Sequence, residues 1–130
     1  MSHSVLVVDD DADVRTSIRK ILETYTFVVV EARSSVEALQ AIRQAIPDVI
    51  ITDIYMPGGD GYELMNSLRE RPVRIPLSAM SGDRPLSGID QLALAEKPGS
   101  TAILDKPFRP SNLVEMVDRV IAGRGAPARS

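Results

Sequence analysis

Short apolar runs that alternate with helical patterns limit most narrowly how this chain can fold. The runs span residues 5–8, 27–30, 49–51, 75–80 and 101–104, and each predicts a strand. Apolar residues at helical spacing follow each run. The runs do not alternate polar with apolar residues, which is typical of strands buried on both faces of a parallel sheet. We therefore predict an α/β protein with a doubly wound, five-stranded parallel sheet and helices on both faces.

The spacing of apolar residues also predicts which helix faces enter the core. For the helix expected from Asp13, the predicted face is Val14, Ile18, Ile21, Leu22 and Tyr25. A capping box from Ser34 to Glu37 predicts the start of the next helix, and Pro47 its end. Its predicted buried residues are Val36, Leu39, Ile42 and Ile46. A last helix is expected from the spacing of Leu113, Val114, Val117, Val120 and Ile121, a short helix over 62–68, and a further helix over 85–97.

The charge balance and the residue types that the chain lacks argue against several functions. With 18 acidic and 15 basic residues the net charge is −3, which disfavours binding to nucleic acid. There is no cysteine, and the one histidine is His3, so thiolate chemistry and a His/Cys metal site are not expected. No apolar run approaches the roughly 20 residues that a membrane helix needs. We expect one cytoplasmic domain with neither nucleic acid nor membrane as a partner.

Polar residues stand where four of the predicted strands end. Asp9 and Asp10 follow the first strand, Asp53 the third, Ser81 the fourth and Lys106 the fifth. The carboxyl ends of parallel strands meet at one edge of the sheet, so these side chains are expected to converge. Carboxylate oxygens suit Mg²⁺, while a lysine and a hydroxyl suit a phosphoryl group. The sequence therefore predicts a site where a carboxylate can attack phosphorus beside a metal ion.

The segments that carry these residues resemble a response-regulator receiver domain, the phosphoacceptor part of two-component signalling. The resemblance rests on VLVVDDD at 5–11, ITDIYMPGGDG at 51–61, MSG at 80–82 and ILDKPF at 103–108, in that order. It implies a flavodoxin-like fold of the receiver type. It also implies a receiver domain over residues 1–122, and we expect residues 123–130 to form a flexible tail.

The resemblance assigns roles around a bound Mg²⁺. Asp53 is implied to be the aspartate that is phosphorylated and also a ligand of the metal. Asp10 is implied to bind Mg²⁺ directly, Asp9 mainly through water, and the backbone carbonyl of Tyr55 to complete the protein ligands. Because the Tyr55 side chain is bulky, we also expect it to slow hydrolysis of the phosphoryl group.

The resemblance also assigns the residues that respond to the phosphoryl group. Ser81 is implied to hydrogen-bond a phosphoryl oxygen, and Lys106 to pair with its negative charge. The family usually carries Tyr or Phe at the switch position three residues before this lysine, where this chain has Ile103. An aliphatic side chain has no phenolic hydroxyl, so this position is where the switch is expected to differ.

Other interpretations of the same residues are weaker. Asp11 and Asp13 are expected to cap the following helix and to face solvent rather than to bind metal. A calcium-binding EF-hand loop is excluded, because Val14 and Lys20 stand where that loop needs glycine and glutamate. Ser78 competes with Ser81 for the contact to phosphate, but the position of the strand end favours Ser81.

The predicted function is that of a phosphoacceptor response regulator rather than an enzyme. A histidine kinase or a histidine phosphotransfer protein would supply the phosphoryl group to Asp53, and a downstream protein would recognise the switched surface. The residues after Ala122 are too few to fold into an output domain, so a single-domain regulator is expected. It is expected to be a monomer or weak homodimer.

Two alternatives stay open at this point. One is a receiver-like docking module that is not productively phosphorylated, which Ile103 allows. The other is a phosphatase of the haloacid-dehalogenase type, with Asp9 as nucleophile and Asp11 as acid. The second fits less well, because it leaves Asp53 without a role and no late acidic pair follows Lys106.

Overall fold

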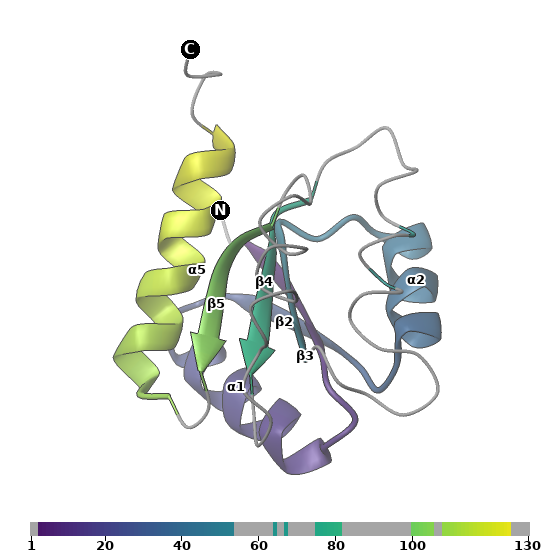
Figure 1. The fold of residues 1–130 in the computed structure, drawn as a ribbon, viewed down its shortest axis with the longest axis horizontal. Coiled ribbons are helices and arrows are strands. Elements are labelled where there is room, and N and C mark those ends of the chain that lie inside the picture. The colour runs from purple at the N-terminus through teal and green to yellow at the C-terminus, as the bar shows by residue number, and fades with distance from the viewer. Residues whose placement is uncertain are drawn as a thin grey trace.

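Five parallel strands form one sheet in the order β2-β1-β3-β4-β5 (Figure 1). The computed structural model describes residues 3–53, 64, 67, 75–81, 100–105 and 108–125; at residues 81, 100–105 and 123–125 the description covers the backbone alone. The strands are β1 (Ser4–Val8), β2 (Val28–Ala32), β3 (Val49–Asp53), β4 (Leu77–Ser81) and β5 (Ser100–Asp105). The chain winds outward from β1 in both directions, so the predicted doubly wound parallel sheet is confirmed.

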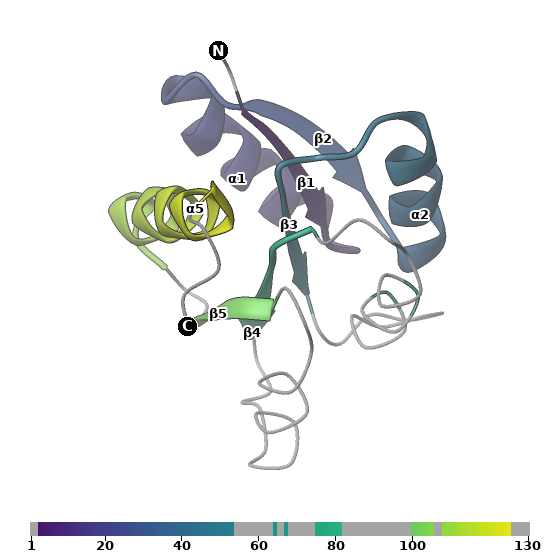
Figure 2. The same cartoon turned by 90° about the horizontal axis from the view of Figure 1, so that it is seen from above.

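Helices cover both faces of this sheet. The described helices are α1 (Ala12–Thr24), α2 (Ser35–Gln44) and α5 (Pro110–Gly125). Figure 2 shows α1 and α5 together on one face and α2 on the opposite face. In the part of the chain that the structure describes, no helix is long and apolar enough to cross a membrane.

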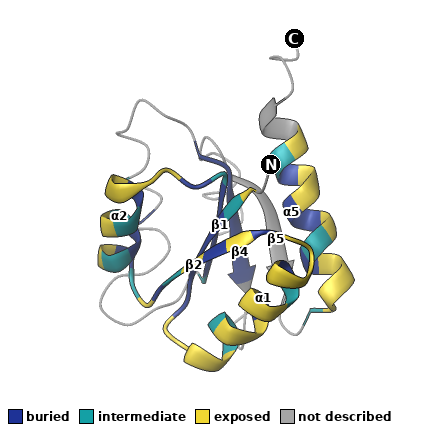
Figure 3. Cartoon of the chain, turned by 180° about the vertical axis from the view of Figure 1, so that it is seen from behind, coloured by how far each residue is buried: buried dark blue, intermediate teal, exposed yellow. Residues whose placement is uncertain are grey.

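Successive side chains of each strand point to opposite faces and so build two core layers. Val5 and Val7 of β1 pack with Ile18 and Leu22 of α1 and with Leu113 of α5. On the other face, the core residues are Leu6, Val8, Ala32, Ala38, Ile42, Ile50, Leu64, Ile75, Leu77 and Ala79. The sheet-facing sides of the helices are buried and their outward faces exposed (Figure 3). This two-sided burial is what fixes the carboxyl edge of the sheet in place.

The edge strand β2 departs from the expected burial. Val28 is 53% exposed and Val30 is 44% exposed, whereas Val29 between them is buried. The prediction that every strand is buried on both faces is therefore wrong for β2. An edge strand has a neighbour on one side only, and the helix on the α2 face contacts it through Ala32, beyond both exposed valines.

The start of α1 is fixed by the acidic loop before it. Asp11 is the N-cap, and its Oδ1 accepts a hydrogen bond from the backbone N–H of Asp13 at 2.9 Å. The predicted capping role of Asp11 is thus confirmed, and both aspartates are exposed. The predicted face of α1 holds except at Tyr25, which is 52% exposed because the helix ends at Thr24.

The second helix begins as predicted but buries a different face. Ser34 caps it by accepting the backbone N–H of Glu37 at 3.2 Å. Its buried residues are Ser35, Ala38 and Ile42. Val36 is 56% exposed, and Ile46 is 52% exposed and lies beyond the helix end at Gln44, so both core predictions are wrong. The sheet-facing side of α2 therefore runs through Ser35, Ala38 and Ile42, and Val36 lies off that face.

The last helix follows its predicted pattern. Leu113, Val117 and Val120 are buried, and Met116, which the pattern did not include, is buried with them. The helix continues to Gly125, three residues beyond the expected end of the domain at residue 122. The helices expected over 62–68 and 85–97 lie outside the described residues, except for residues 64 and 67, which are helical.

Candidate functional site

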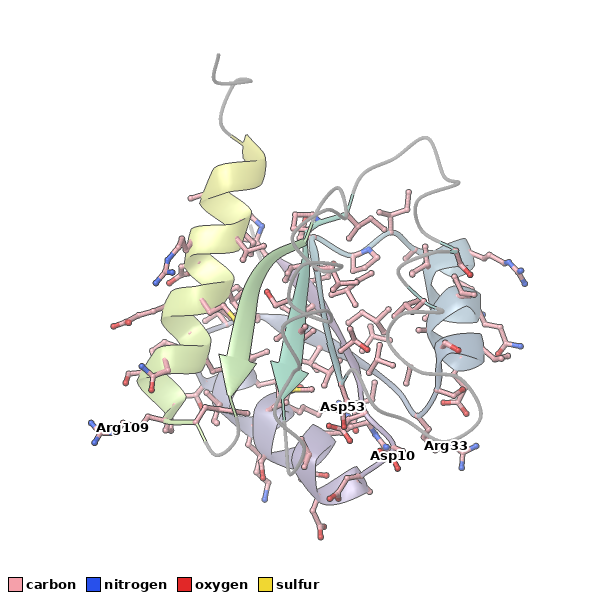
Figure 4. The ribbon with its side chains drawn as sticks, in the orientation of Figure 1. Asp10, Arg33, Asp53 and Arg109 are labelled. Atoms are coloured by element: carbon pink, nitrogen blue, oxygen red, sulfur yellow. The ribbon has the colours of Figure 1, made fainter. Side chains whose placement is uncertain are left out.

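Three aspartates meet at the carboxyl edge of the sheet. Val8 pairs in register with Thr52, so Asp9, which follows β1, and Asp53, which ends β3, leave neighbouring strands side by side. Carboxylate oxygens of Asp9, Asp10 and Asp53 all lie within 4.8 Å of one another. Figure 4 shows the side chains of Asp10 and Asp53 at this edge. The structure therefore brings together the three acids that the sequence placed at strand ends.

Asp9 is held rigidly by its surroundings. It is fully buried, and its backbone N–H donates to the carbonyl of Ala32 at 3.1 Å. Its Oδ1 accepts the backbone N–H of Asp11 at 2.9 Å, and its carbonyl accepts Nη1 of Arg15 at 2.7 Å. Hydrogen bonds of this kind offset the cost of burying a carboxylate.

The other two acids are more open to solvent. Asp10 is exposed and Asp53 is partly buried. Two full charges about 5 Å apart repel by roughly 3 kcal/mol at an effective dielectric constant of about 20. A cation bound between these carboxylates would reduce that repulsion.

The donor set fits a hard divalent cation. The three acids offer only oxygen ligands, and Mg²⁺ usually completes such a protein ligand set with water and phosphate oxygens. Mg²⁺ prefers such an incomplete protein cage more than Ca²⁺, which takes a larger number of protein oxygens. Asp9, Asp10 and Asp53 could thus hold a metal ion, with Asp9 buried and Asp10 exposed.

The remaining predicted site residues are described only in part. Ser81 is the last residue of β4 and Ile103 lies within β5, both described by their backbone alone. Asp53 pairs with Met80, so Ser81 follows one position further toward the same edge. Tyr55 and Lys106 lie outside the described residues.

Ser78 is a core residue. It pairs with Ile51, two positions before the pair formed by Asp53 and Met80, and it is fully buried. Within the described part of the chain its hydroxyl has no hydrogen-bond partner. It lies too far inside the sheet to compete with Ser81 for a group at the carboxyl edge.

The sequence did not identify one residue that contacts the site. Arg15 reaches from α1 to the carbonyl of Asp9 and also binds Glu31 of β2 at 3.1 Å. The available signal was a basic side chain one helical turn after the capping residue Asp11, on a helix that leaves the acidic loop. A single arginine at that spacing is common on exposed helix faces, so sequence alone did not distinguish it.

Comparison with known proteins agrees with this geometry. The family model of the response regulator receiver domain matches residues 5–118. The chain belongs to that family, and it is a receiver domain of two-component signalling rather than a phosphatase of the haloacid-dehalogenase type.

The chain is similar to several regulators. It is 35% identical over 129 residues to the transcriptional regulatory protein PrrA of Mycobacterium tuberculosis, covering 99% of this chain and 54% of PrrA. It is 31% identical over 118 residues to the DNA-binding transcriptional regulator NtrC of Escherichia coli, covering 91% of this chain and 24% of NtrC. The crystal structure of the chemotaxis response regulator CheY4 of Vibrio cholerae matches with a TM-score of 0.81 and 30% identity, covering 92% of this chain and 99% of CheY4.

The lengths and names of these relatives bear on the expectation about nucleic acid. The chain spans about half the length of PrrA and about a quarter of NtrC. NtrC is named as a DNA-binding protein, which conflicts with the expectation that nucleic acid is excluded as a partner. That expectation rested on the charge of this chain alone, and a net charge of −3 describes only the residues present. It is therefore withdrawn.

Proposed function

We propose that this receiver domain accepts a phosphoryl group on Asp53 in a Mg²⁺-dependent reaction. The observation that carries the proposal is the convergence of Asp9, Asp10 and Asp53, whose carboxylate oxygens lie within 4.8 Å of one another at the carboxyl ends of β1 and β3. In this reaction a carboxylate oxygen of Asp53 forms a bond to phosphorus while the bond from phosphorus to the donor's histidine nitrogen breaks. The product is an acyl phosphate on Asp53.

In this proposal Asp10 and Asp53 bind Mg²⁺ directly, Asp9 binds it mainly through water, and the Tyr55 carbonyl adds a further ligand. Bound Mg²⁺ supplies positive charge to the phosphoryl oxygens. The chain's own contribution is to hold three oxygen donors together, which the buried and hydrogen-bonded Asp9 supports. Asp53 is only partly buried, which is compatible with transfer from a donor protein.

The response to phosphorylation is assigned to the next two strands. Ser81 would donate a hydrogen bond to a phosphoryl oxygen, and Lys106 would pair with the added charge, which reaches about −2 on a phosphorylated side chain. Ile103 occupies the switch position. The end of β4 at Ser81, one position past the residue opposite Asp53, supports this assignment.

The partners follow from the reaction class. A histidine kinase or a histidine phosphotransfer protein supplies the phosphoryl group, in the cytoplasm, and a downstream protein recognises the phosphorylated form. The domain acts as a monomer or weak homodimer and assists its own phosphorylation and dephosphorylation. We assign residues 1–122 and the rest of α5, which ends at Gly125, to the receiver domain, with the remaining residues as a tail.

The test is intact mass after incubation with acetyl phosphate, with and without Mg²⁺. The wild type is expected to gain one phosphoryl group only with Mg²⁺, and Asp53→Asn is expected to gain none. Asp118→Asn, which removes an exposed carboxylate on α5, is the matched control and should behave as the wild type. A wild type that folds but never gains mass would favour the docking module.

A further inference from the structure

Arg15 connects the acidic site to β2, the strand at one side of the sheet. It lies on α1, yet its Nη1 donates to the carbonyl oxygen of Asp9 at 2.7 Å and its Nε donates to Oε1 of Glu31 at 3.1 Å. The side chain is only 12% exposed. The guanidinium is thus largely shielded from water. Its donors form a rigid fork, which lets it bind both acceptors at once.

Glu31 is itself fixed by a second arginine. Arg19, one turn further along α1, donates Nη1 to Oε2 of Glu31 at 2.9 Å and Nε to Glu23 at 3.1 Å. Arg19 is 48% exposed, and neither of these contacts reaches the acidic site. The two arginines therefore share one carboxylate, but only Arg15 also binds Asp9.

The contact from Arg15 adds to the hydrogen bonds that anchor Asp9. The backbone N–H of Asp9 is bound to Ala32, one carboxylate oxygen to the N–H of Asp11, and its carbonyl to Arg15. That carbonyl belongs to the peptide group that joins Asp9 to Asp10. Since Asp10 is exposed, its orientation toward Asp53 depends on how this peptide group is held.

We propose that Arg15 is a positioning residue for the metal site. It fixes the peptide group between Asp9 and Asp10, so that the two carboxylates face the cation together. The inference rests on the proposed Mg²⁺-dependent function and adds to it a residue that does not touch the metal. Residues of this kind that orient ligands typically change metal affinity by about 10- to 100-fold when replaced.

The direction of the change in Mg²⁺ affinity distinguishes a positioning role of Arg15 from a purely electrostatic one. A guanidinium close to a cation site repels the cation, so removing its charge should tighten Mg²⁺ binding if charge were all that mattered. A positioning role predicts the opposite, because loss of the hydrogen bond frees the peptide group of Asp10. The two explanations therefore predict changes in opposite directions.

The experiment measures Mg²⁺ affinity by isothermal titration calorimetry in wild type, Arg15→Met and Arg19→Met. Arg15→Met is expected to bind Mg²⁺ about tenfold more weakly. Arg19→Met removes the same charge and also a contact to Glu31, and it should stay within about twofold of wild type. In metal-free protein, the backbone amide resonance of Asp10 should shift in Arg15→Met and not in Arg19→Met.

A third variant covers the case in which Arg15→Met does not fold. Arg15→Lys keeps the charge, but one ammonium group cannot hold Asp9 and Glu31 in the same fork, so we expect about threefold weaker binding. Unchanged or tighter binding in the Arg15 variants would overturn the proposal, as would an equal loss in Arg19→Met. If the wild type binds no Mg²⁺, the proposed function is overturned as well. If the wild type is phosphorylated but the Arg15 variants bind Mg²⁺ as tightly as it does, only the role of Arg15 is overturned.

Discussion

Val8 of β1 lies opposite Thr52 of β3, and this pairing carries Asp9 and Asp53 to the same edge of the sheet. The register is held by apolar side chains on both faces, since Val7 pairs with Ile51 and Leu6 with Ile50, and all four are buried. A slip by one residue would turn Asp53 to the opposite face of the sheet. The geometry of the site is thus a consequence of core packing in its two central strands.

Replacing Asp10 with asparagine is expected to stabilise the metal-free protein while weakening its response to Mg²⁺. Three carboxylates lie within 4.8 Å of one another, so removing one charge relieves repulsion. Because Asp10 is exposed to solvent, the expected gain is only about 1 kcal/mol, which corresponds to about 4 °C in Tm. Thermal unfolding at low salt, with and without MgCl₂, measures both effects, and Asp118→Asn serves as control. An Asp10→Asn protein that is less stable without metal, or that Mg²⁺ stabilises as much as wild type, would contradict the account.

Replacing Ser78 with alanine is expected to leave stability nearly unchanged or slightly raised. The hydroxyl is buried and has no partner within the described residues, so alanine removes a polar group that gains nothing from the core. We expect a change of no more than about 1 kcal/mol. Chemical denaturation measures it, beside Leu77→Ala, where loss of a buried leucine should cost about 2–5 kcal/mol. A loss above about 2 kcal/mol in Ser78→Ala would show that the hydroxyl is hydrogen-bonded.

Replacing Thr26 with glycine is expected to stabilise the end of α1. Thr26 has φ of 69°, a left-handed conformation that suits glycine and is costly for a β-branched residue. The backbone N–H of Thr26 donates to Glu23 and that of Phe27 to Leu22, the pair of bonds of a Schellman motif, in which glycine is the preferred residue at this position. After the greater flexibility of glycine in the unfolded chain is included, we expect a gain of about 0.5–1 kcal/mol. Thr24→Gly, inside the helix, is the control and should be destabilising; a similar loss at Thr26 would contradict the assigned conformation.

The stability of the protein is expected to depend on Glu37 in mildly acidic solution. The backbone N–H of Arg33, and then its guanidinium, hydrogen-bond this carboxylate and lower its pKa from the usual value of 4.5. A lowered pKa means that Glu37 stabilises the fold above pH 4.5 and that this contribution is lost as the pH falls through the folded-state pKa. Glu37→Gln should therefore be less stable than wild type at neutral pH, with the difference disappearing in acid. Unfolding by urea across this pH range measures it, with Glu115→Gln on α5 as control, and a difference that persists at the lowest pH would contradict the assignment.

The alternation of apolar runs and helical patterns was enough to predict the sheet, its parallel strands and the acids at its edge. Each strand was found within a few residues, because a short run rich in β-branched residues, such as Val5–Val8, is typical of a strand buried on both faces. The convergence of Asp9 with Asp53 followed from the rule that parallel strands end at one edge. Helix capping by Asp11 and Ser34 could also be predicted, since it depends on residues close in sequence.

What the sequence did not show depends on contacts between distant elements. Val28 and Val30 look like core residues until the strand order places β2 at an edge. Val36 is exposed instead of buried, because α2 turns small residues such as Ala38 toward the sheet. Arg15 could not be distinguished from a surface arginine, since its hydrogen bond to the carbonyl of Asp9 is seen only in the folded structure.

The most direct test of the central claim is to locate the phosphoryl group. After reaction with acetyl phosphate and Mg²⁺, reduction with borohydride converts an aspartyl phosphate to homoserine, which peptide mass spectrometry identifies by position. We expect homoserine at residue 53 and at no other aspartate. Homoserine at Asp9 or Asp10, with Asp53 unmodified, would contradict this expectation.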